Sequence, residues 1–106
     1  MTGRNRSPLE AVQEEHRLLA LLRALLRLPG YAANALLLRD CLDTLGLVAS
    51  HDVIRADLQR LQELGLCTLV TESDVQRVAL TQPGMDVAEG RSQMEGILRP
   101  GPECRY

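Results

Sequence analysis

Leucines recur at helical spacing early in the chain and predict a long first helix over residues 8–28. Ser7 is a suitable cap, a proline follows at the first helical position, and Glu10 completes a capping box. Pro29-Gly30 ends the helix. Its apolar side spans an arc of roughly 200°, about twice what a surface helix needs. We therefore expect this helix to be central to the fold or shared by two subunits of a homodimer, with the candidate interface residues Leu18, Leu21 and Leu25.

Two shorter helices are predicted next, each preceded by a polar cap and followed by a glycine. The second spans about 35–45 after Asn34, and its expected inner face is Leu37, Leu38, Cys41, Leu42 and Leu45. The third spans about 51–64 after Ser50, and its expected inner face is Val53, Ile54, Leu58, Leu61 and Leu64. Asp57 lies within this apolar arc, where an unpartnered carboxylate is costly. We expect an arginine or the amides of a helix start to anchor it.

The pattern then changes to segments rich in Val, Leu and Thr, which predict two strands at 66–71 and 75–81 with a turn between them. Thr81 is expected to cap a short helix over about 82–89, and residues 91–106 to form an irregular tail. This order predicts a mainly α fold with a small β-hairpin. We interpret residues 1–90 as a winged helix-turn-helix domain with a three-helix core, a two-stranded wing over 66–81 and a short last helix.

Composition and charge narrow the possible functions. The 106 residues suffice for one domain, and the formal charge of −2 excludes a protein that binds nucleic acid through an overall basic surface. DNA binding would therefore need a local patch. The longest apolar stretch is too short to cross a bilayer, and the first residues lack the apolar region of a signal peptide, so we expect no membrane association and a cytoplasmic location.

The residues that could support catalysis or metal binding are widely separated. The three cysteines, Cys41, Cys67 and Cys104, have no metal-ligand spacing, and their odd number argues against a disulfide framework. His16 and His51 form no catalytic arrangement with Ser, Asp or Cys that the spacing indicates. We expect no metal, no cofactor and no enzymatic activity.

Residues 46–66 resemble the recognition-helix stretch of bacterial winged-helix regulators, a capped helix followed by Gly-Leu and a wing. Nearly the whole chain is similar to small winged-helix proteins of Mu-like phages and prophages, which are themselves similar to arsenical-repressor-type transcriptional regulators. The resemblance is carried by residues 46–66 together with Pro29-Gly30-Tyr31, Asn34, Leu80-Thr81, Gly84, Asp86-Val87-Ala88, Gly90-Arg91 and Arg99-Pro100. It implies a winged helix and binding of double-stranded DNA. The metal-sensing Cys-x-Cys pattern of the larger group is absent, so metal sensing is not implied.

The exposed face of the third helix holds the candidate DNA contacts. Arg55 and Gln59 lie near its middle, one turn apart, and these side-chain types read guanine and adenine through paired hydrogen bonds. Ser50 and the first amides of the helix could hold a phosphate. The complete candidate set is Ser50, His51, Arg55, Gln59, Arg60 and, on the wing, Arg77. These residues suit a transcriptional regulator or a phage accessory factor.

Acidic residues on the same surfaces support an alternative function. Asp52 and Glu63 share the exposed face of the third helix, and Glu72 and Asp74 occupy the turn of the wing. Carboxylates at these positions would repel phosphates. The alternative is therefore a winged helix that binds a phage or host protein during phage assembly or host takeover, without binding DNA.

Overall fold

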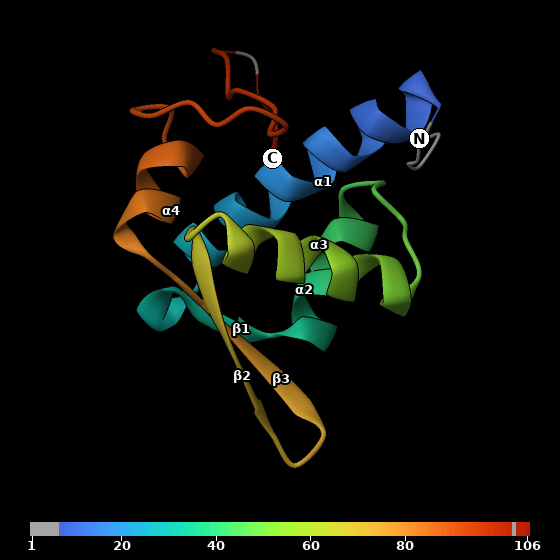
Figure 1. The fold of residues 1–106 in the computed structure, drawn as a ribbon, viewed down its shortest axis with the longest axis vertical. Coiled ribbons are helices and arrows are strands. Elements are labelled where there is room, and N and C mark those ends of the chain that lie inside the picture. Colours follow the sequence, from blue (N-terminus) through green and yellow to red (C-terminus); the bar gives the residue numbers. More distant parts are fainter. Residues whose placement is uncertain (1–6, 103) are drawn as a thin grey trace.

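The computed structural model describes residues 7–102 and 104–106 and shows a mainly helical protein with a small antiparallel sheet (Figure 1). Its elements in chain order are α1 (Pro8–Arg27), a short 3-10 helix (Pro29–Tyr31), β1 (Ala32–Asn34), α2 (Ala35–Thr44), α3 (His51–Glu63), β2 (Cys67–Glu72), β3 (Val75–Leu80) and α4 (Gln82–Ala88). The helices pack together, and the β2–β3 hairpin extends away from them.

The four α-helices of the described part begin at the predicted caps. The Ser7 side chain accepts a hydrogen bond from the Glu10 amide, and Glu10 accepts one from the Ser7 amide. The other three helices each start with one side-chain oxygen that accepts an amide hydrogen bond two or three residues into the helix. These oxygens belong to Asn34, Ser50 and Thr81.

The sheet has three strands in the order β1-β3-β2: the predicted hairpin is present as β2 and β3, and β1, which was not predicted, adds a third strand. β1 pairs with β3 in the register Ala32↔Ala79 to Asn34↔Arg77. Gly30 and Tyr31, with φ of 69° and 56°, turn the chain from α1 toward this strand. β1 has only three residues and no alternating pattern of its own, so its extended conformation depends on pairing with β3.

α1 lies at the centre of the core, as the width of its leucine arc predicts. Five of its leucines are fully buried: Leu18, Leu19, Leu21, Leu22 and Leu25. This set contains the three candidate interface residues Leu18, Leu21 and Leu25. Because the other elements of the same chain already cover them, they cannot contact a second intact chain, and that assignment is corrected. The oligomeric state itself stays a prediction.

Two predicted inner-face residues at the margins of their apolar arcs are exposed. Leu37 on α2 is 43% exposed and Val53 on α3 is 37% exposed. The structure buries narrower stripes, with Leu38 and Leu42 on α2 and Ile54, Leu58 and Leu61 on α3. The predicted apolar arcs were too wide, because neighbouring elements cover only the central part of each arc.

The segment after α4 has neither helix nor strand in its described residues, 91–102 and 104–106, and we call it the strap. Figure 1 shows it running back from α4 to α1. Ile97 of the strap is buried in the core, and the Leu98 amide donates a hydrogen bond to the Glu15 carbonyl of α1 at 3.2 Å. The predicted tail is therefore irregular in conformation and nevertheless packed on the body of the protein.

Candidate nucleic-acid interface

α3 turns one side to the core and the other to solvent. Ile54, Leu58 and Leu61 are buried, whereas the opposite side carries the residues predicted to meet DNA. Of those residues, His51, Arg55, Gln59 and Arg60 are all exposed. A helix with an exposed side can enter a groove of DNA or of a protein. The side chains on that exposed side determine which of these partners it binds.

Ser50 lies at the exposed start of α3 and caps the helix. Its hydroxyl accepts a hydrogen bond from the Val53 amide at 3.2 Å, which satisfies one of the free amides at the helix start. The hydroxyl is therefore engaged within the chain. The partial positive charge of the helix start remains available to an anion.

Asp57 ties α3 to α1. Its carboxylate is 4% exposed and accepts two hydrogen bonds from Arg17, from Nε at 2.5 Å and from Nη2 at 3.3 Å. Such a paired contact sets direction as well as distance. The expectation of an arginine partner is confirmed, and the pair positions α3 for whatever its outer side binds.

His51 and Arg55 line a hollow of about 350 Å³ between α2, α3 and the hairpin. The β2–β3 hairpin contributes Asp74 and Val75 near its tip, and α2 contributes Leu36, which is 56% exposed. The remaining lining residues are Ala35, Thr71 and Gln76. Apart from Asp74, these α2 and hairpin residues were missed from the sequence, although Leu36 could have been found because it lies outside the apolar stripe of α2.

Gln59 and Arg60 line a different hollow, between α3 and α1. Their neighbours there include Glu14, Arg17 and Glu63. The guanidinium of Arg60 also lies beside Gly96 of the strap, where a side-chain carbon would come within 3.7 Å of Nη2. The structure thus divides the candidate residues of α3 into a hairpin side, with His51 and Arg55, and an α1 side, with Gln59 and Arg60.

Arg77, the candidate on the hairpin, lies on the face of the sheet away from the helices and so apart from the α3 candidates; its role as a DNA contact stays a prediction. Successive strand residues point to opposite faces. The side chain of its neighbour Val78 is fully buried in the core, whereas Arg77 is exposed and pairs in register with Val70 of β2. Arg77 also forms an exposed ion pair with Glu72, N to O 3.8 Å.

The charges around α3 are mixed. Arg55 lines the hollow on the hairpin side of α3, and Asp74 lines the same hollow. Asp52 and Glu63 are exposed on the outer side of the helix, and Glu72 and Asp74 are exposed on the hairpin. Among the described residues that line the hollow beside the hairpin, Arg55 is the one arginine, so this surface carries no basic stripe.

The cysteines are separate and differ in environment. Cys67 is buried, whereas Cys41 and Cys104 are partly exposed, and all three are free. Burial raises the pKa of the Cys67 thiol to about 11. Among residues 7–102 and 104–106, no three His, Cys, Asp or Glu side chains lie together in a way that could hold a metal ion.

We expect Cys67 to be the slowest of the three cysteines to react with a thiol reagent near neutral pH, because the thiolate is the reactive form. Labelling followed by peptide mass spectrometry would check this, and fast labelling of Cys67 in the folded chain would contradict it. The folded chain also holds the Cys67 proton more tightly than the unfolded chain. Its contribution to stability should therefore be lost as the pH rises from 9.0 to about 11.

Comparison with known proteins gives one informative match. The chain is 41% identical over 90 residues to "Uncharacterized protein gp26" of Escherichia phage Mu, and the match covers 85% of this chain and 93% of that protein. No protein-family model matches the chain, and no solved structure matches it. In the described part of the chain, no helix has the length and apolar character needed to span a bilayer.

Proposed function

The chain belongs to the family of the phage Mu protein gp26, and from that premise we propose that it is a winged-helix protein that binds double-stranded DNA through α3. In this proposal α2 and α3 form the helix-turn-helix, α3 enters the major groove and the β2–β3 hairpin is the wing. The protein acts on phage or prophage DNA in the host cytoplasm. Its role is that of a transcriptional regulator or accessory DNA-binding factor, comparable to arsenical-repressor-type regulators, and not that of an enzyme.

The observation that carries the proposal is the pair Arg55 and Gln59 on an exposed and firmly held helix. They are one turn apart, and Arg17–Asp57 and the Ser50 cap fix the direction of the helix. Within the described residues, no hydrogen bond or ion pair engages the side chain of Arg55 or Gln59. Arginine can bind guanine and glutamine can bind adenine through two hydrogen bonds each, so the pair is equipped to read a short sequence.

The acidic surroundings favour specificity over general affinity. Most affinity for DNA comes from cations that neutralise phosphates. Here Arg77 is paired with Glu72 on the far face, and Asp74 faces the hollow that Arg55 lines. We therefore propose weak binding to arbitrary duplexes and stronger binding to a preferred site.

A mobility-shift assay on the DNA that surrounds the chain's own gene tests the proposal. We expect a shifted complex whose affinity falls as salt rises, with a shallow slope because few phosphates are neutralised. A scrambled duplex of the same length and composition is the control and should bind more weakly. The absence of any complex at low salt, with the helical circular dichroism intact, would contradict DNA binding.

A second candidate function is the binding of a phage or host protein. It is favoured by the exposed side chains of Leu36 and Val75, which place apolar surface in the hollow beside His51 and Arg55. Exposed apolar residues near the centre of a polar rim are typical of protein interfaces. Under this alternative, Leu36→Glu would abolish capture of the protein partner, whereas under the DNA proposal it would weaken DNA binding through added phosphate repulsion.

A further inference from the structure

One side of α1 holds the far part of the strap through three polar side chains, His16, Arg23 and Arg27. His16 Nδ1 and the Tyr106 hydroxyl are hydrogen-bond partners 2.7 Å apart, and the two rings meet edge to face with centroids 5.6 Å apart. Arg23 Nε donates to the main-chain oxygen of Tyr106 at 3.0 Å, and Arg27 donates to the same oxygen. We call His16, Arg23 and Arg27 the tyrosine site. Their spacing of seven and four residues places them on one side of the helix.

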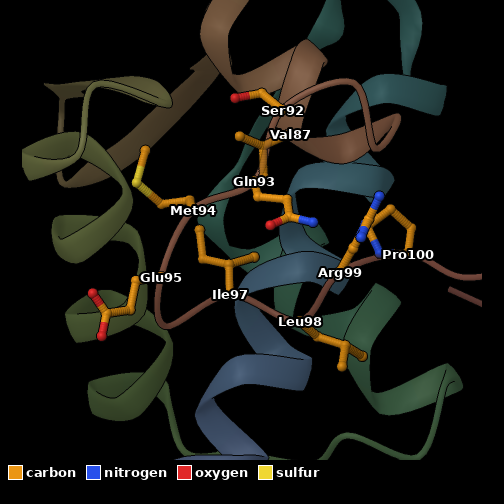
Figure 2. A pocket seen from close by; sticks show the side chains of 9 residues that line it. All are labelled: Val87, Ser92, Gln93, Met94, Glu95, Ile97, Leu98, Arg99 and Pro100. Atoms are coloured by element: carbon orange, nitrogen blue, oxygen red, sulfur yellow. The ribbon is translucent and has the colours of Figure 1, made fainter.

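The rest of the strap is held by apolar contacts that leave space unfilled. Ile97 is buried, and Met94, Leu98 and Cys104 are partly buried against the core. A hollow of about 330 Å³ remains between the strap and α4, where Figure 2 shows Val87 facing the strap side chains. A second hollow, of about 440 Å³, lies beside His16 and Tyr106. Both hollows are open to solvent, so the strap runs along the surface and other elements do not enclose its margins.

A short turn directs the strap toward the α1 of its own chain. Gly90 has a φ of 81°, and the amides of Arg91 and Ser92 donate to the Asp86 carbonyl at 2.8 and 3.2 Å. The Arg91 guanidinium contacts the Asp86 carboxylate at 2.7 Å and pairs with Glu89. Arg91 therefore joins the first residues of the strap to α4 and holds the turn in its present direction.

We propose that two copies of the chain form a dimer by exchanging straps, so that Tyr106 of each copy enters the tyrosine site of the other. The occupant is a second copy because the site is already complementary to this segment, and exchange recreates the same contacts between chains. Only the turn at residues 90–92 changes, so it sets the balance between monomer and dimer. In this dimer α1 contacts the other copy through the tyrosine site, whereas its leucines stay buried within one chain. It does not depend on DNA binding.

Light scattering after size exclusion, over a range of concentrations of the full chain, is the first test. The wild type should shift from monomer to dimer as its concentration rises. Arg91→Ala removes the contacts that hold the turn, and we expect a several-fold larger dimer fraction at equal concentration. Monomer alone at every concentration, for both proteins, would overturn the proposal.

Complementation of two defective variants is the second test. Tyr106→Ala damages the strap, and Arg23→Ala combined with Arg27→Ala damages the site. Each variant alone should be monomeric, whereas their mixture should form heterodimers, because one intact strap meets one intact site. Arg105→Ala, which removes an exposed strap arginine outside the tyrosine site, is the control for loss of charge and should dimerise like the wild type.

A third test uses only wild-type chains and therefore does not depend on whether the variants fold. Two batches with different isotope labels are mixed, and native mass spectrometry detects mixed dimers. Heterodimers should appear slowly after mixing, because straps must detach before they exchange. Immediate mixing would indicate contact between outer surfaces and would overturn the proposal. Dimerisation of the Tyr106→Ala variant at the wild-type level would overturn it as well.

Discussion

Replacing Arg17 with alanine is expected to lower the free energy of unfolding by about 3–5 kcal/mol, the usual cost of removing one partner of a buried ion pair. The change takes two hydrogen bonds from the carboxylate of Asp57, which stays buried between α1 and α3. The Arg17 side chain is only 16% exposed, so water cannot readily replace it. The loss is large relative to the total stability of a domain of this size.

Urea unfolding followed by circular dichroism measures this effect. Arg55→Ala on the exposed side of α3 is the matched control, and it should change stability by less than about 0.5 kcal/mol. The double variant Arg17→Met with Asp57→Leu should recover most of the loss, because apolar residues of similar size can replace a buried pair without leaving an uncompensated charge. Equal stability of Arg17→Ala and the wild type would show that the pair does not anchor α3.

Arg55→Ala is expected to weaken binding to the preferred DNA site by about 1–3 kcal/mol, which corresponds to about fivefold to more than a hundredfold. The reason is the loss of a paired contact to a base, so binding to a scrambled duplex should change much less. Arg77→Ala removes the same charge from the far face of the sheet and should have a smaller effect. Competition assays with both duplexes measure the difference.

The double substitution Glu72→Asn with Asp74→Asn should strengthen DNA binding, the opposite of the effect of Arg55→Ala. Replacing Glu72 and Asp74 removes phosphate repulsion from the hairpin without adding a contact to a base, so affinity for any duplex should rise. Arg55 would then control sequence preference and the hairpin would control general affinity.

The comparison of Arg55→Ala with Arg77→Ala also identifies the binding surface. If Arg77→Ala weakened binding as strongly as Arg55→Ala, the far face of the sheet rather than α3 would be the binding surface.

Local chemistry made much of this protein predictable from its sequence. Ser7, Asn34, Ser50 and Thr81 each cap a helix, because capping needs only a side-chain oxygen and amides two or three residues away. Asp57 was expected to bind an arginine or the amides of a helix start, since a carboxylate in an apolar arc requires a partner, and it binds Arg17. The phage relationship was also recognisable from residue patterns, and the match to the phage Mu protein supports it. The winged-helix assignment and DNA binding stay proposals.

Only the tertiary structure decided the properties that depend on segments far apart in the sequence. β1 forms because β3 offers a partner, and its three residues carry no strand pattern. Leu18, Leu21 and Leu25 matched a subunit interface equally well until the rest of the chain was seen to cover them. Arg55, Arg60 and Arg77 looked alike as exposed cations, but they lie on three different surfaces. The sequence determines which side of its own helix or strand each residue occupies, and only packing determines what that side faces.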